Sequence, residues 1–187
     1  MYSVLPNKLL IQGGELSDGF LQIGCNSFHD ACKFVWKLPY GRTSDRANWR
    51  LVLTEKTGTC STKHALLKAL SDDLDLGVQL TIGIYPMQES NTPGVGKVLS
   101  AHSIESIPEA HCYLRYAGLR VDLTRFGFEA ENPISEFWVE KDITPDDIGE
   151  FKHTFHKEFI LTQFGAKKSE QIWSVRELCI QALSTQQ

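Results

Sequence analysis

The sequence has no long apolar run, no strong excess of charge of one sign and no pair of cysteines spaced C-x-x-C. No stretch approaches the ~20 apolar residues of a membrane span, so we expect no membrane partner. The 19 basic and 23 acidic residues are intermixed and give a net charge of -4, which argues against a nucleic-acid partner. The first residues also lack the pattern of a secretory signal, and we therefore expect a cytoplasmic protein.

Cysteine is present but follows no structural pattern. The five cysteines, at positions 25, 32, 60, 112 and 179, are odd in number and irregularly spaced. This distribution indicates neither a disulfide framework nor a zinc finger, so we expect reduced thiols. With 187 residues, 42% of them hydrophobic, the chain can bury a sizeable core, and we expect one domain spanning residues 1–187.

The N-terminal half alternates predicted strands and helices. Two strand-like pieces, NKLLIQ and GFLQIG, lie in the first 25 residues. Helical spacing of apolar residues predicts a helix over 27–37, ended by a Pro and a Gly. Residues 42–58 are polar with a short apolar centre and predict a loop or a short helix. Alternation over 78–85 then predicts a half-buried strand.

The C-terminal half begins with an irregular stretch over 86–109, a length that is often a functional loop. Two alternating runs, 110–116 and 119–125, predict strands. Residues 144–184 predict amphipathic helices that cover the sheet, the first behind a Thr144 cap. Two histidines of this region, His153 and His156, lie among lysines and are expected to be solvated.

The helix predicted after KTGT begins with a cysteine. Leucines at 66, 67, 70 and 74 form its apolar stripe, and Cys60, His64 and Leu67 lie on one side because they are four and seven residues apart. A helix N-terminus offers free N–H groups and partial positive charge, which lower a thiol's pKa and can hold an oxyanion. Cys60 is therefore a candidate nucleophile.

His111 and Asp122 flank a predicted hairpin whose turn is Ala117-Gly118. With a two-residue turn, counting outward makes His111 and Asp122 diagonal neighbours on one face, roughly 7 Å apart at their backbones. A three-residue turn would reverse the parity and separate them. We predict that the two side chains share a face, where the carboxylate can hold the imidazole.

These pieces, GTCSTKHALLKAL, a following strand and AHCYLRYAGLRVDLT, together resemble the core of the transglutaminase-like superfamily in a bacterial form. The order of Cys, His and Asp and the short His-to-Asp interval agree over residues 40–126. The resemblance implies an α+β fold with a papain/transglutaminase-like core, in which the helix bearing the Cys packs on an antiparallel sheet. It implies Cys60 as nucleophile, His111 as general base and acid, and Asp122 as the orienting carboxylate. The residue after His111 is Cys112, where the family has a small residue.

The resemblance also implies a reaction class. A peptide-like or small amide would acylate Cys60, and the thioester would pass to water or to an amine, as in a hydrolase or an acyl transferase, with no cofactor. An upstream aromatic residue often completes the family's oxyanion hole. The candidates here are Trp49, Tyr40 and Trp36, with His64 as a further residue that lines the pocket.

Other interpretations stay open. A binding module of the same fold would use the groove to hold a peptide or protein without turnover. Cys60, His64, His111 and Asp122 are also zinc-ligand types, although only ligand type supports a metal site. Taken alone, Cys60 would be a buried structural cysteine, because free Cys is among the most buried residues. The joint presence of His111 and Asp122 favours the enzyme.

Overall fold

The computed structural model describes residues 2–127 and 134–184, and within them it has an α+β fold. The elements, in chain order, are η1 (Tyr2–Val4), α1 (Glu15–Gln22), α2 (Phe28–Lys37), α3 (Leu51–Glu55), α4 (Cys60–Asp73), β1 (Gln79–Met87), α5 (Gly96–Ala101), β2 (Ile107–Tyr116), β3 (Leu119–Val121), β4 (Val139–Ile143), η2 (Pro145–Ile148), α6 (Glu150–Phe164) and α7 (Ala166–Ser184). The strands form one antiparallel sheet in the order β3-β2-β1-β4. The predicted α+β class is confirmed.

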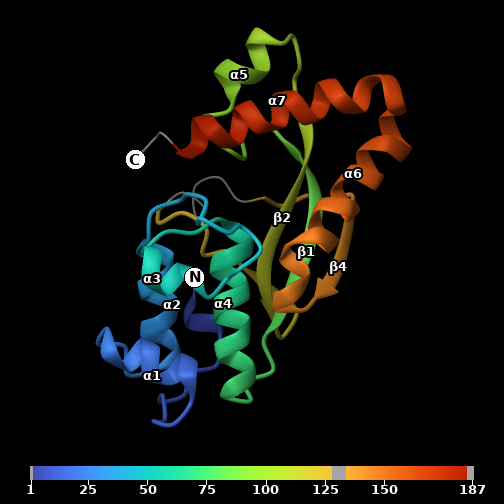
Figure 1. Ribbon diagram of the computed structural model, residues 1–187. Coiled ribbons are helices and arrows are strands. Elements are labelled where there is room, and N and C mark those ends of the chain that lie inside the picture. Colours follow the sequence, from blue (N-terminus) through green and yellow to red (C-terminus); the bar gives the residue numbers. More distant parts are fainter. Residues whose placement is uncertain (1, 128–133, 185–187) are drawn as a thin grey trace.

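The helices occupy different sides and ends of the sheet (Figure 1). The N-terminal helices α1 to α4 gather beside it, and α4 packs on β2. Helix α6 runs along the sheet, while α7 crosses near α5 at the far end of the long strands. Both C-terminal helices contact β2, as predicted for helices that cover the sheet. No helix in the two described ranges is long and apolar enough to cross a membrane.

Two separate clusters of buried apolar side chains support this arrangement. The larger one joins α1 to α4 with one face of β1 and β2, including Leu66, Ile82 and Cys112. The smaller one joins the far ends of β1 and β2 to α5, α6 and α7, including Met87 and Cys179. Cys60 is buried, with 6% of its surface exposed, yet it belongs to neither cluster. The candidate nucleophile thus lies at the boundary, where polar side chains can reach it.

The hairpin has the predicted two-residue turn. Ala117 and Gly118 both have positive φ, 48° and 79°, and the flanking Tyr116 pairs with Leu119. The second strand is shorter than predicted, because β3 ends at Val121 and the ladder stops there. The side chain of Asp122 instead accepts bonds from the backbone and side chain of residue 124, and such local bonds compete with a strand ladder.

The two strands predicted near the N-terminus are wrong. GFLQIG largely belongs to helix α1, which begins after Gly14, carries acidic residues in its first turn and buries Phe20. The carboxylate of Asp18 accepts a hydrogen bond from the N–H of Gly13 at 3.0 Å and so fixes the start of this helix. NKLLIQ contributes only an isolated bridge between Leu9 and Ser27. Short apolar runs do not distinguish strand from helix by period alone.

The remaining predictions of secondary structure agree more closely with the structure. Helix α2 follows a Ser27 cap whose hydroxyl accepts from the N–H of Asp30, close to the predicted start. The stretch over 86–109 is less irregular than expected, because it contains α5 and the beginning of β2. Thr144 caps a 3-10 turn, η2, before α6 begins at Glu150. Strand β4, at the edge of the sheet, was not predicted.

Candidate active site

Cys60 is the first residue of α4. Thr59 and Thr62 form a capping box around this start, in which the N–H of Thr59 donates to Thr62 Oγ1 at 3.0 Å. An isolated bridge between Tyr40 and Gly58 fixes the preceding turn. The first N–H groups of a helix have no partner within the helix and concentrate its positive dipole end. The local sequence therefore places the thiol of Cys60 at a site that favours negative charge.

The predicted contact between His111 and Asp122 is confirmed. His111 Nε2 and Asp122 Oδ2 lie 2.6 Å apart. Asp122 Oδ1 accepts two further bonds, from the N–H and the hydroxyl of Thr124 at 3.0 and 2.6 Å. On β1, Gly83 stands opposite His111, and a Cβ there would overlap the ring of Phe137. Asp122 thus fixes the orientation of the His111 imidazole, and Thr124 in turn fixes the carboxylate of Asp122.

The charges at the site favour an ion pair between Cys60 and His111, with the Asp122 carboxylate beside the imidazolium. Burial alone would raise the pKa of Cys60, but the positive charges of Lys152 and His111 outweigh it and lower the pKa to about 6. Burial disfavours charge on His111 too, yet the Asp122 carboxylate and the Cys60 thiolate raise its pKa well above the usual value. The same imidazolium holds the pKa of Asp122 far below its usual range, despite burial. A thiolate and an imidazolium therefore coexist near neutral pH.

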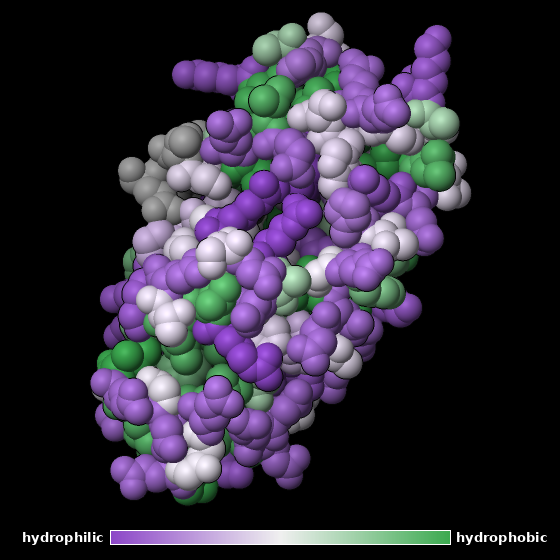
Figure 2. Space-filling model, in the orientation of Figure 1, coloured by the Kyte–Doolittle hydropathy of each residue, from purple (hydrophilic) through white to green (hydrophobic). Residues whose placement is uncertain are grey.

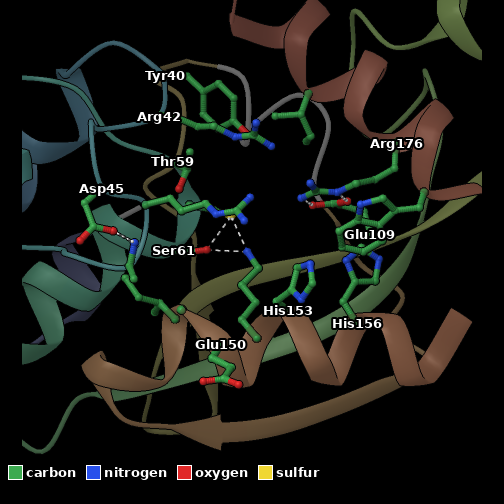
Figure 3. A pocket seen from close by; sticks show the side chains of 18 residues that line it. Tyr40, Arg42, Asp45, Thr59, Ser61, Glu109, Glu150, His153, His156 and Arg176 are labelled. Carbon is green, nitrogen blue, oxygen red and sulfur yellow. Dashed lines mark hydrogen bonds and ion pairs between the residues drawn. The ribbon is translucent and has the colours of Figure 1, made fainter. Parts of the chain in front are cut away.

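The sulfur opens onto a hollow of about 310 Å³. Hydrophilic side chains gather across the middle of the face shown in Figure 2, between the part with α1 to α4 and the part with α5 and α7. Figure 3 shows Tyr40, Arg42 and Asp45 on one side of the hollow and Glu109, His156 and Arg176 on the other. Most of the lining residues are charged, polar or aromatic, and Ile148 and Ile180 are among the aliphatic ones.

A second, smaller hollow lies on the His111 side of the sulfur. Its volume is about 50 Å³, and Cys60, His111, Asp122 and Thr92 are among its lining residues. A water molecule needs roughly 10–15 Å³ of such space and two to four polar partners. This side of the nucleophile can therefore hold water or a small leaving group within reach of the imidazole.

The three aromatic residues proposed for the oxyanion hole are not equivalent. Trp36 donates its indole N–H to Arg125 O at 3.2 Å, and Trp49 donates to Asp146 Oδ1 at 3.3 Å. Trp49 lines a different hollow, and neither tryptophan lines the two at the sulfur. Tyr40 lines both and is thus the only one of the three aromatic candidates that the structure brings to Cys60.

His64 connects the start of α4, which bears Cys60, to the segment that bears Asp122 through two hydrogen bonds. Its Nε2 accepts the N–H of Leu123 at 2.8 Å, so its Nδ1 carries the proton and donates to Cys60 O at 2.8 Å. Both ring nitrogens are therefore occupied. Burial lowers the pKa of His64 to about 4, against 6.5 for the free side chain, and keeps the ring neutral. Since the unfolded chain binds this proton more readily, the stability that the neutral ring provides is lost as the pH falls from 6.5 towards 4.

Replacing His64 should destabilise the fold. In His64→Ala the buried N–H of Leu123 loses its acceptor and a space opens beside α4, so we expect the free energy of unfolding to fall by about 2–4 kcal/mol. Denaturant unfolding at pH 7 measures this loss, with the exposed His102→Ala as control. A loss below roughly 1 kcal/mol, the contribution of one ordinary hydrogen bond, would show that the contacts of His64 do not hold the two segments together.

Sequence reasoning missed residues that α6 and α7 bring to the site. His156, expected to be solvated, is 1% exposed, and its Nε2 lies 2.9 Å from Pro108 O. Arg176 donates two bonds to the buried Glu109, at 2.7 and 2.8 Å. Lys152 Nζ lies 3.8 Å from Cys60 Sγ. The pattern of charges along the helices did not indicate which side faces the sheet.

The zinc alternative receives no support from the arrangement of side chains. Within residues 2–127 and 134–184, no three His, Cys, Asp or Glu side chains come together in a way that could hold a metal ion. His64 also has both ring nitrogens engaged in hydrogen bonds. The residues at the sulfur are instead arranged as an ion pair with an orienting carboxylate.

No family model, curated protein or solved structure matches this chain. The geometry of Cys60, His111 and Asp122, with the two hollows beside the sulfur, is therefore what indicates a function.

Proposed function

We propose that this protein is a cysteine-dependent amide hydrolase or acyl transferase that acts through a thioester on Cys60, and that its core is papain/transglutaminase-like. The observation that supports it most is the 2.6 Å contact between His111 and Asp122 beside a thiol at a helix start. A nucleophile, a base and a group that orients the base are the three parts that such chemistry needs.

The reaction follows from these parts. The Cys60 thiolate attacks the carbonyl carbon, a C–S bond forms, and the π electrons move to the oxygen. When the oxyanion collapses, the C–N bond breaks and the His111 imidazolium gives its proton to the leaving amine. Water or a second amine then loses a proton to His111 and attacks the thioester, the C–S bond breaks, and the thiolate returns. Asp122 stabilises the imidazolium throughout.

The two hollows suggest where the substrate lies. The polar acyl part of a peptide-like amide fits the 310 Å³ hollow, and the amine or water fits the 50 Å³ hollow beside His111. All five cysteines are free and buried, and a thiolate enzyme needs its nucleophile reduced. A reducing compartment such as the cytoplasm is therefore the setting we propose.

Trapping the acyl-enzyme tests this proposal. The protein is mixed with a panel of peptide amides, and the reaction is quenched in acid. The protein is then digested, and the mass of the peptide containing Cys60 is measured by mass spectrometry. We expect it to gain the mass of the acyl group, and added primary amine to compete with water for release. Peptide binding with neither acylation nor turnover would instead identify a binding module.

A further inference from the structure

Lys152 on α6 presents its ammonium group to the candidate nucleophile. Its Nζ lies 3.8 Å from Cys60 Sγ and donates to Ser61 Oγ at 2.5 Å, contacts that dashed lines mark beside Ser61 in Figure 3. Ser61 Oγ lies 3.8 Å from the sulfur. The lysine lines the 310 Å³ hollow, as does Cys60. The ammonium thus lies on the side of the sulfur where a substrate would enter.

This ammonium has no carboxylate within 4 Å among the described residues. Glu109, which lines the same hollow, is already bound by two hydrogen bonds from Arg176. Taking an ammonium group out of water without an anion to compensate it is costly. Lys152 instead faces a thiol, whose deprotonated form is the anion that compensates it.

We infer that Lys152 is a fourth catalytic residue, whose ammonium stabilises the negative charge of the reaction, first on the sulfur and then on the carbonyl oxygen. This inference rests on the proposed function. When the thiolate attacks, its charge moves to an oxygen two bonds from the sulfur. The lysine stem is flexible and its charge compact, so Nζ can follow that movement. A cation placed where charge develops in a site shielded from water lowers the barrier.

Lys152 also fills a role for which all of the predicted candidates except Tyr40 are poorly placed. The indole N–H groups of Trp36 and Trp49 are engaged elsewhere, and both ring nitrogens of His64 are in use. Besides Tyr40, the first N–H groups of α4 and the ammonium of Lys152 lie at the large hollow and can donate. Together they make an oxyanion site with one charged member.

The charges around the sulfur favour a protonated lysine. Burial alone would lower the pKa of Lys152, but the negative charges of Cys60, Cys112 and Glu109 raise it above the usual value. The other titratable groups that influence the sulfur or its partners include Tyr40, His64, Tyr85, His111, Asp122, His156 and Arg176. An ammonium that keeps its proton can stabilise anions throughout the working pH range.

Three variants test the inference: Lys152→Met, Lys152→Arg and, as control, Lys157→Met, which removes the same charge from the same helix. Lys157 lies over the ring of Trp173 and does not line either hollow at the sulfur. The pH midpoint of Cys60 alkylation by iodoacetamide and kcat/KM on an amide are measured for each. In Lys152→Met we expect the midpoint to rise by about one unit or more and kcat/KM to fall by about 10²–10³.

Lys152→Arg should keep most of the low midpoint because it keeps the charge, and Lys157→Met should match the wild type. A wild-type midpoint and wild-type turnover in Lys152→Met would overturn the inference while leaving the proposed function intact. Failure of the proposed function has a different signature, in which the wild-type protein itself turns over no amide. In that event a raised midpoint in Lys152→Met still supports an interaction between the Lys152 ammonium and the Cys60 thiol. An unchanged midpoint would show that no such interaction stabilises the thiolate.

Discussion

Cys60→Ser should lose turnover by a factor on the order of 10⁴ or more while the fold persists. The exchange of sulfur for oxygen barely changes volume, so the capping box at Thr59 and Thr62 should survive. A serine hydroxyl has a far higher pKa than a thiol, and the positive charges that suffice to ionise Cys60 cannot ionise it. The measurement is kcat/KM on the amide that acylates the wild-type protein, with the free energy of unfolding determined alongside.

Cys25→Ser is the matched control for this substitution. Cys25 is also buried, but burial raises the pKa of its thiol and it lines neither hollow at Cys60. We expect its turnover to stay near that of the wild type. Appreciable turnover in Cys60→Ser would show that the thiol does not carry the reaction.

Asp122→Asn should lower kcat by about 10³, through the protonation of His111. Two donors from Thr124 hold Oδ1 of Asp122, so the amide oxygen of an asparagine should stay there and its NH₂ should point at His111 Nε2. That nitrogen must then accept a hydrogen bond and cannot carry a proton. The imidazolium is lost, and the thiolate loses its partner.

The pH midpoint of Cys60 alkylation distinguishes this cause from a general disturbance of the fold. We expect the midpoint to rise in Asp122→Asn, because a neutral His111 no longer favours the thiolate. Asp142→Asn is the control, since Asp142 also accepts a threonine hydroxyl, from Thr81 at 2.6 Å, but lines neither hollow at the sulfur. A raised midpoint in the control, or an unchanged one in Asp122→Asn, would contradict this account of the carboxylate.

Much of the site was predictable because its signals are local in the sequence. The apolar stripe behind Cys60 has the helical period, and Ala117-Gly118 has the chemistry of a two-residue turn. Parity along the hairpin then brings His111 and Asp122 to one face, as the 2.6 Å contact confirms. The length of the second strand was not predictable in this way, because the bonds from Thr124 to Asp122 end the ladder early.

Lys152 and His156 could not be predicted, because their roles depend on how α6 packs. Each follows a phenylalanine and precedes a basic residue type, so the sequence around them does not tell them apart from solvated residues. Only contact with β2 distinguishes the buried side of the helix. Lys152 lies 92 residues from Cys60 along the chain. Strand β4 escaped detection for a similar reason, since its sequence VEKDI is mostly exposed and its pairing with β1 defines it.

The rate of iodoacetamide modification of Cys60 between about pH 4 and 10, assigned by peptide mass, is the most direct test of the thiolate and imidazolium pair. It is measured in the wild-type protein and in His111→Ala. We expect a midpoint near 6 in the wild type, well below the ~8.5 of a free thiol, and a higher one in the variant. A wild-type midpoint at or above ~8.5 that does not move in His111→Ala would mean that Cys60 is a packed thiol and no nucleophile.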